Sequence, residues 1–188
     1  AYKGERTSLI IGDDNVIREF VTLHRGTVKG GGKTVIGHRN FFMAYSHVAH
    51  DCQIGHQVVM ANGATLAGHI VIEDYAVIGG LSAIHQFCRV GAHAFISGLT
   101  GVVLDIPPYM LAAGSRAKLF GLNTVGLKRQ NFREETIRAL KTAYRIIFRS
   151  SLTLEKAIKK VEKSEIFQIP EVEHLLRFIQ QTKRGICR

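Results

Sequence analysis

Cysteine, proline and tryptophan are scarce in this sequence. Its 188 residues include three cysteines, three prolines and no tryptophan, and aromatic side chains make up only 8%. Three cysteines argue against a disulfide framework. No apolar run is long enough to cross a membrane, and no signal peptide opens the chain. The sequence therefore predicts a protein of a reducing compartment, the cytoplasm, without stable membrane insertion.

Acidic residues are outnumbered only in the C-terminal part of the chain. Residues 1–115 hold eight basic and eight acidic side chains, whereas residues 116–188 hold seventeen and seven, so the whole net charge of +10 lies in this tail. A basic tail predicts an acidic partner, which could be nucleic acid, anionic lipid or an acidic protein. A solvated helix face with spare lysines explains the charge equally well.

Apolar residues recur every six positions along the first hundred residues. Neither the 3.6-residue period of a helix nor the alternation of a strand gives a strict period of six. Hexapeptide repeats are typical of β-helices, in which three hexads build one triangular coil. The fifteen positions predicted to point inward are Ile11, Ile17, Leu23, Ile36, Phe42, Val48, Ile54, Met60, Leu66, Ile72, Ile78, Ile84, Val90, Ile96 and Val102.

The register slips once, by seven residues, between Leu23 and Ile36. The slip contains residues 25–33, with three consecutive glycines, which must loop out of the prism. Cys52 and Cys88 take the inward fifth position of their hexads, two coils or about 10 Å apart. Because a disulfide needs Cα atoms within about 7 Å, we expect both to be reduced core residues.

The repeats are predicted to end near Pro107 and Pro108, since proline cannot donate to a strand ladder. We assign residues 1–116 to the β-helix domain and 117–188 to a connecting segment with a small helical domain. Because the chain enters a repeat almost at once, we expect that N-terminal coils are missing. Asn131 and Glu134 predict the cap of the first of three helices, and Pro170 suits the first turn of the last.

Histidines gather on one side of the predicted prism. Adding 18 to a residue number moves up one coil, about 4.8 Å. His50 should thus lie beneath Gly68 and Gly68 beneath Gln86, with Asp51 beneath His69. The group expected within three coils is His47, His50, Asp51, His69, His85 and Gln86. Three histidines fall on another side and are predicted to be plain surface residues: His38, His56 and His93.

Clustered imidazoles serve as metal ligands or as general bases. No two histidines are five apart, as in the zinc-binding β-helical carbonic anhydrases, and there is no Cys-x-x-Cys or carboxylate cluster. His50 with Asp51 and the backbone N–H of Gly68 would supply a base, an acidic orienter and an oxyanion donor, the parts that acyl transfer requires. No serine or cysteine nucleophile stands beside His50, which favours direct transfer. An exposed polar face without function is the other interpretation.

Seven segments resemble one family, the UDP-N-acetylglucosamine O-acyltransferases that start lipid A synthesis. The resemblance runs from about residue 2 to about residue 132 and is weak in the helical tail. It rests on residues 17–27, the triple-glycine loop, Ala-His-Asp-Cys (49–52), Leu-Ala-Gly-His (66–69), Ile-His-Gln-Phe (84–87), Pro-Pro-Tyr (107–109) and Gly-Leu-Lys-Arg (126–129).

The resemblance implies a left-handed parallel β-helix, an exception to the usual right-handed crossover, assembled as a homotrimer. It implies transfer of an R-3-hydroxyacyl chain from acyl carrier protein to the 3-position of UDP-N-acetylglucosamine or its 3-amino analogue, without metal or other cofactor. His50 becomes the general base, Asp51 its hydrogen-bonded neighbour and Gly68 the oxyanion donor. The residues implied to bind substrate are His47, His69, His85, Gln86, Gly98, Asn123 and Arg129.

Within that set, the resemblance makes Gly98 the determinant of acyl length and places Asn123 and Arg129 near the uridine and phosphate. Three departures stand out. The family's Asp-x-Lys before Tyr2 is absent, Gln130 replaces a frequent arginine, and Arg116 stands where histidine is common.

Two other functions compete with this one. The chain could be a non-catalytic scaffold whose basic tail binds an acidic protein or nucleic acid. Nucleic-acid binding is disfavoured, because Tyr144 and Phe148 of the tail lie on apolar helix faces rather than among the basic residues. The chain could also use acetyl-coenzyme A, or act as the N-acyltransferase of a later step.

Overall fold

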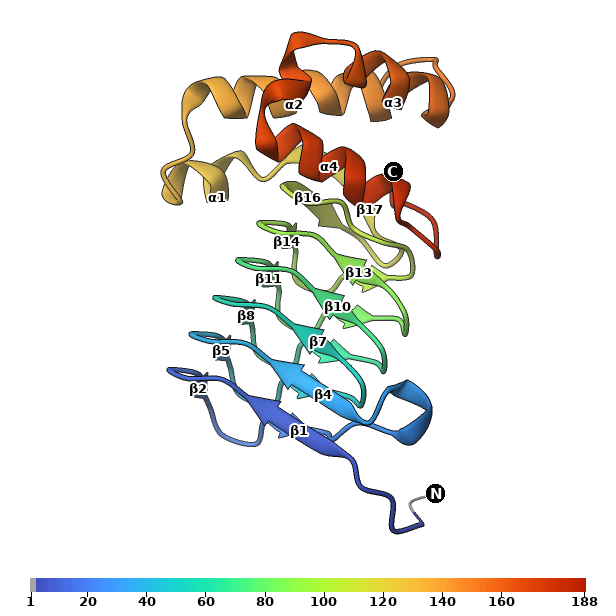
Figure 1. Cartoon of the computed structure of the whole chain (residues 1–188). Coiled ribbons are helices and arrows are strands. Elements are labelled where there is room, and N and C mark those ends of the chain that lie inside the picture. The colour runs from blue at the N-terminus through green and yellow to red at the C-terminus, as the bar shows by residue number, and fades with distance from the viewer. Residues whose placement is uncertain (1–2) are drawn as a thin grey trace.

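The structure, a computed structural model, describes residues 3–188 and is a left-handed parallel β-helix with helices over its C-terminal end (Figure 1). Three sheets form the sides of the prism. Sheet A holds β1 (Ser8–Ile11), β4 (Lys33–Ile36), β7 (Gln53–Ile54), β10 (Val71–Ile72) and β13 (Arg89–Val90). Sheet B holds β2 (Val16–Ile17), β5 (Phe41–Phe42), β8 (Val59–Met60), β11 (Val77–Ile78), β14 (Phe95–Ile96), β16 (Met110–Ala113) and β17 (Lys118–Leu122). Sheet C holds β3 (Thr22–Leu23), β6 (His47–Val48), β9 (Thr65–Leu66), β12 (Ala83–Ile84) and β15 (Gly101–Val102).

The period of six marks the core of the prism. All twelve apolar positions from Ile36 to Val102 are buried, none more than 3% exposed, which confirms the prediction. Ile11 and Ile17 keep the same register, paired with Ile36 and Phe42, but are 41% and 43% exposed. They belong to the first coil, which has a neighbouring coil on one side only within the described residues.

Sharp corners join the short strands of the three sheets. Non-glycine residues in the left-handed conformation recur there, a backbone region that L-residues seldom occupy. Asp51 (φ 62°), His69 (φ 61°) and Phe87 (φ 65°) form one such column, between sheet C and sheet A. The backbone conformation at this corner therefore fixes the direction in which these three side chains project.

Sheet B continues beyond Pro107 and Pro108, so the prediction that the strand ladder ends there is wrong. β16 pairs with β14 in parallel, and β17 turns back to pair with β16 in antiparallel. Both prolines precede β16, so every residue of β16 keeps the backbone N–H that proline lacks. Since β17 follows residue 116, the assigned domain boundary falls inside sheet B, and the division into two domains stays a prediction.

The helices are α1 (Thr124–Arg129), α2 (Glu134–Phe148), α3 (Leu154–Glu162) and α4 (Pro170–Gln180), with short 3₁₀ turns at Val28–Gly30 and Glu165–Gln168. The predicted cap at Asn131 is wrong, because Arg133 is the N-cap of α2 and Asn131 has a left-handed turn after α1. Pro170 begins α4 as predicted. No helix within residues 3–188 is long and apolar enough to cross a membrane.

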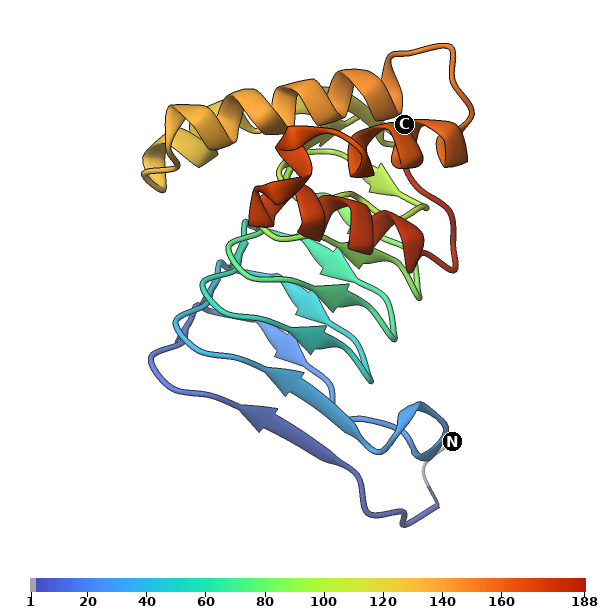
Figure 2. The ribbon, with the colours of Figure 1, turned by 45° about the horizontal axis from the view of Figure 1, so that its top comes forward.

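The helical tail packs on the upper coils (Figure 2). The Arg89 guanidinium lies 4.0 Å from the ring centre of Phe178 in α4, and Asp105 forms a parallel bridge with Ile186. His174 of α4 contacts Glu73 at 3.0 Å. These contacts join the two parts of the chain by both apolar and polar surface.

Candidate active site

The corner between sheets C and A brings His50 and Asp51 together. We call this column of residues 49–51, 67–69 and 85–87 the histidine corner. The Nδ1 atom of His50 lies 2.8 Å from Oδ2 of Asp51. The His50 side chain is 42% exposed, whereas the Asp51 side chain is fully buried. An accessible imidazole is thus oriented by a carboxylate that water does not reach.

The buried carboxylate of Asp51 is held by hydrogen bonds from a residue the sequence did not single out. The backbone N–H of Thr27 donates to Oδ1 at 2.7 Å, and its hydroxyl donates to Oδ2 at 2.7 Å. Burial alone would raise the pKa of Asp51, but the bonds from Thr27 and His50 outweigh it and lower that pKa. Asp51 is therefore an ionised orienting group.

Gly68 lies directly against the His50 ring. A Cβ atom added at Gly68 would stand 2.6 Å from Cε1 of His50, closer than any side chain tolerates. Among residues 3–188, no acceptor is present for the Gly68 N–H. The glycine thus allows close approach of the imidazole to a backbone donor, as a reaction that develops an oxyanion requires.

His69 completes the first layer of the corner. Its Nε2 atom lies 3.8 Å from Oδ2 of Asp51, and its ring stacks on Phe87 with centroids 4.6 Å apart. The potential ligand atoms of His50, Asp51 and His69 lie within 4.8 Å of one another, which would suit a metal ion. Oδ2 of Asp51 already faces two hydrogen-bond partners, Thr27 and His50, an arrangement typical of a hydrogen-bonded dyad. That no metal takes part stays a prediction.

The other predicted residues of this side lie around the same corner. His47 of β6 pairs with Thr65 of β9, and Thr65 pairs with Ala83 of β12, so the coils stack at the predicted spacing of 18 residues. His85 and Gln86 lie one coil above Gly68 and are exposed. His47 lies on β6.

His47 makes its own contacts on sheet C. Its Nδ1 atom is 2.7 Å from the hydroxyl of Thr22, and its ring meets His24 edge to face at 4.7 Å. Burial, helped by the nearby His24, lowers the pKa of His47. A neutral imidazole at this position can accept or donate one hydrogen bond to a bound polar group.

Three predicted residues lie elsewhere on the chain. Gly98 is at the corner between sheets B and C, where an added Cβ would approach the carbonyl oxygen of Gly80 at 3.2 Å. Asn123 caps α1 through a bond from Gly126 and donates to the His93 carbonyl. Asn123 and Arg129 line a cavity of about 580 Å³ against the outer face of sheet B. Within one chain, these residues do not meet His50.

His93 lines the same cavity, so the prediction that it is a plain surface residue is wrong. Its ring stacks between Tyr75, at 4.6 Å, and Tyr109, at 5.9 Å. Burial lowers the pKa of His93 to about 4. The 18-residue step from Tyr75 to His93 was visible in the sequence, but the covering segment from residue 109 onward was not.

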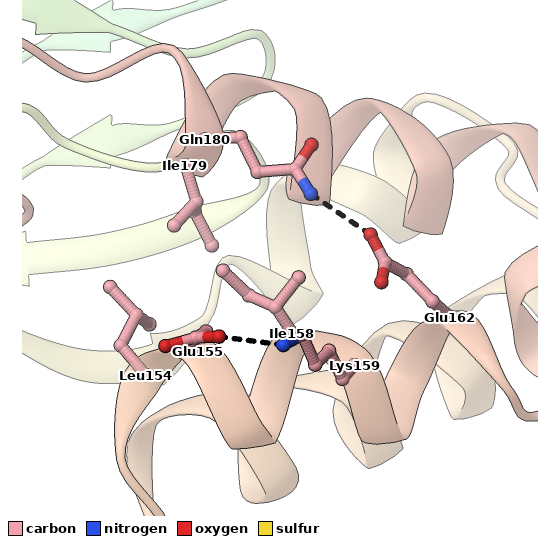
Figure 3. Close-up of a pocket in the computed structure, with 7 residues that line it drawn as sticks. All are labelled: Leu154, Glu155, Ile158, Lys159, Glu162, Ile179 and Gln180. Carbon is pink, nitrogen blue, oxygen red and sulfur yellow. Dashed lines mark hydrogen bonds and ion pairs between the residues drawn. The ribbon is translucent and has the colours of Figure 1, made fainter.

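A further groove lies between α3 and α4 (Figure 3). Leu154, Ile158 and Ile179 form its apolar floor, and polar pairs of Glu155 with Lys159 and of Gln180 with Glu162 border it. None of the predicted site residues lines this groove.

Comparisons with known proteins identify relatives over the whole length of the chain. Hexapeptide transferase repeats match residues 33–68, and the family described as UDP N-acetylglucosamine O-acyltransferase, domain 2, matches residues 105–187. The acyl-(acyl-carrier-protein)–UDP-N-acetylglucosamine O-acyltransferase of Thermodesulfovibrio yellowstonii is 62% identical over 187 residues, covering all of this chain and 72% of that protein. The chain belongs to the UDP-N-acetylglucosamine O-acyltransferase family. It is therefore an acyltransferase.

Other members of the UDP-N-acetylglucosamine O-acyltransferase family are similarly close. The enzyme of Anaeromyxobacter dehalogenans is 50% identical, again over all of this chain and 72% of its own length. The crystal structure of the Bacteroides fragilis UDP-N-acetylglucosamine acyltransferase superposes with a TM-score of 0.95 at 41% identity, covering 100% of this chain and 72% of that one. Because the family match extends over residues 105–187, the expectation that the resemblance is weak in the helical tail is wrong.

Proposed function

We propose that this chain transfers an R-3-hydroxyacyl group from acyl carrier protein to the 3-position of UDP-N-acetylglucosamine or its 3-amino analogue, in the first step of lipid A synthesis. The observation that carries the proposal is the juxtaposition of His50, Asp51 and Gly68 at one corner of a chain of this family. The relatives' names supply the donor and the acceptor.

The chemistry assigned to these residues is general-base catalysis. The Nδ1 atom of His50 is bound to Asp51, which leaves Nε2 to take the proton of the sugar 3-hydroxyl or 3-amine as its heteroatom attacks the thioester carbonyl. Gly68 N–H donates to the oxyanion, and Asp51 stabilises the imidazolium. Collapse breaks the carbon–sulfur bond, and the imidazolium returns the proton to the thiolate of the carrier.

We further propose that the working enzyme is a homotrimer. His50 and the cavity with Asn123 and Arg129 lie on different sides of one prism, so one sugar nucleotide reaches both only if two chains adjoin. A column of exposed apolar side chains at the corner between sheets B and C supports such contacts. It consists of Phe20, Tyr45, Leu81 and Leu99. Sedimentation should show a trimer, and a monomer would contradict this assignment.

The acidic partner of the tail is, in this proposal, acyl carrier protein. Arg138, Lys141 and Arg145 follow one another along the exposed side of α2. Attraction between opposite charges raises the association rate and weakens as the Debye length falls from about 10 Å at 0.1 M salt to about 3 Å at 1 M. The affinity for carrier protein should fall steeply with salt; an affinity indifferent to salt would argue against this surface.

The reaction is assigned to the cytoplasm, where the three buried free thiols remain reduced. The proposal is tested by mass spectrometry of the products formed from acyl carrier protein thioesters of graded chain length, with the 3-hydroxyl and the 3-amino sugar nucleotide in parallel. Coenzyme A thioesters form the comparison arm. Acylated sugar nucleotide from carrier thioesters supports the function. Transfer from acetyl-coenzyme A alone, or no transfer, would reject it.

A further inference from the structure

The loop that interrupts the repeat register covers the carboxylate of Asp51. Thr27, in this loop, binds both oxygens of Asp51, one through its backbone and one through its hydroxyl, each at 2.7 Å. A Cβ atom added at Gly30 would lie 2.0 Å from Cγ of Asp51, so the loop backbone rests directly on the carboxylate. This packing closes the side of Asp51 that His50 leaves open.

The loop is itself fixed to the first coils. The Gly26 N–H donates to the Ser8 carbonyl at 2.9 Å, and the Gly32 N–H donates back to the Thr27 carbonyl at 2.8 Å. The Thr27 hydroxyl accepts a bond from the Gly30 N–H at 3.2 Å. With its acceptor side occupied, the hydroxyl directs its proton to Asp51, which as an ionised carboxylate can only accept.

We propose that Thr27 is a positioning residue that acts on the reaction through Asp51, fixing the carboxylate and with it the tautomer and orientation of His50. The inference rests on the proposed function. Two bonds from one residue hold both carboxylate oxygens, so the plane of the carboxylate cannot rotate while Oδ2 receives the His50 Nδ1–H. Nε2 of His50 is then presented, unprotonated, to the acceptor.

The kinetic test removes the hydroxyl and then restores it. Thr27→Val, nearly the same in shape, should lower kcat about tenfold, the size of one lost hydrogen bond to a charged group, with KM for both substrates unchanged. Thr27→Ser should recover the rate. The matched control is Gly31→Ala, which strains the same loop at φ 95° but meets no atom within 4 Å. It should lower the unfolding temperature and leave kcat near that of the wild type.

A double-mutant cycle separates positioning from general stabilisation of the loop. If Thr27 acts through Asp51, Thr27→Val should cost little further in an Asp51→Asn background, because the group it holds is already gone. Multiplicative losses in the double variant would overturn the proposal. So would a Gly31→Ala variant as slow as Thr27→Val, since loop stability alone would then explain the effect.

A readout that needs no turnover keeps the inference distinguishable from the proposed function. The Nδ1–H proton of His50 should give a sharp low-field NMR resonance in the wild type and in Thr27→Ser, and should exchange rapidly with water in Thr27→Val. If the resonance differs in this way but the chain shows no transferase activity, the proposed reaction is rejected and the positioning role of Thr27 is still supported. An unchanged resonance in Thr27→Val would overturn the positioning role, whatever the activity.

Discussion

At the scale of single residues, the space beside the His50 ring admits a backbone and nothing larger. Gly68→Ala would place a methyl group 2.6 Å from Cε1 of His50 and push the imidazole out of line. Because misplacement of a catalytic group by about 1 Å can cost about 10²-fold in rate, we expect a loss of that order in kcat. Steady-state kinetics checks this, and near-normal turnover in Gly68→Ala would show that the contact is not needed.

The residues of the site were predictable wherever the register is unbroken. The 18-residue step correctly stacked His50, Gly68 and Gln86, because paired residues between Ile36 and Val102 are always 18 apart. It could not place Thr27 on Asp51, since the inserted loop folds back by its own turns. Asn123 and Arg129 also escaped spatial assignment, because they lie beyond the repeats.

At the scale of elements, the same hexad position is buried to a different extent in different coils. Ile72 in β10 is 1% exposed, whereas Ile11 in β1 of the same sheet is 41% exposed. Ile72→Ala should lower the free energy of unfolding by about 2–5 kcal/mol, the usual cost of emptying a packed core site, and Ile11→Ala by clearly less. Denaturant unfolding measures both. Equal losses would contradict the dependence of these losses on burial.

His93 makes the seam between β-helix and tail sensitive to acid. Its folded-state pKa of about 4 lies below the ordinary 6.5, so the unfolded chain binds the proton more readily between these values. The contribution of this site to stability should fall as pH drops from about 6.5 to about 4. Around His93 lie Asp74, which opposes the shift, His174, which adds to it, and the rings of Tyr75 and Tyr109.

The variant His93→Phe keeps a ring for stacking and removes the titration. Its unfolding temperature should decline less than that of the wild type between pH 6.5 and pH 4, measured by thermal scans. His85→Phe replaces an exposed histidine and serves as the control, with the pH dependence of the wild type. A His93→Phe profile parallel to that of the wild type would contradict a buried neutral imidazole at this seam.

Elements were easier to predict than their ends. The period of six predicted the strands, and the apolar stripes predicted α2, α3 and α4. Both patterns are visible in the sequence because the side chains that are buried in the structure are the apolar ones. The start of α2 was misplaced, since Asn131 closes the preceding turn instead of capping the helix. The predicted end of sheet B was too early in the chain, because Pro107 and Pro108 precede β16 and do not interrupt it.

At the scale of the whole molecule, the prism separates groups that the reaction would use together. The histidine corner and the cavity near Arg129 face different ways on one chain, so in the proposed homotrimer two adjoining chains would form the complete site. The basic tail lies at the C-terminal end of the prism (Figure 1), and the sequence holds no comparable acidic stretch. In the proposed homotrimer, the donor and the acceptor would thus approach from different elements.

His50 is, in the proposed function, the base of the acyl transfer. This role is tested by the single-turnover rate from a 3-hydroxyacyl carrier protein thioester to UDP-N-acetylglucosamine, in the wild type, His50→Ala and the control His56→Ala, whose exposed histidine lies on another corner. Loss of a positioned base should lower the rate of His50→Ala about 10²–10⁴-fold, with nucleotide-sugar binding retained and His56→Ala unaffected. A His50→Ala variant that transfers the acyl group at the wild-type rate would exclude His50 as the base.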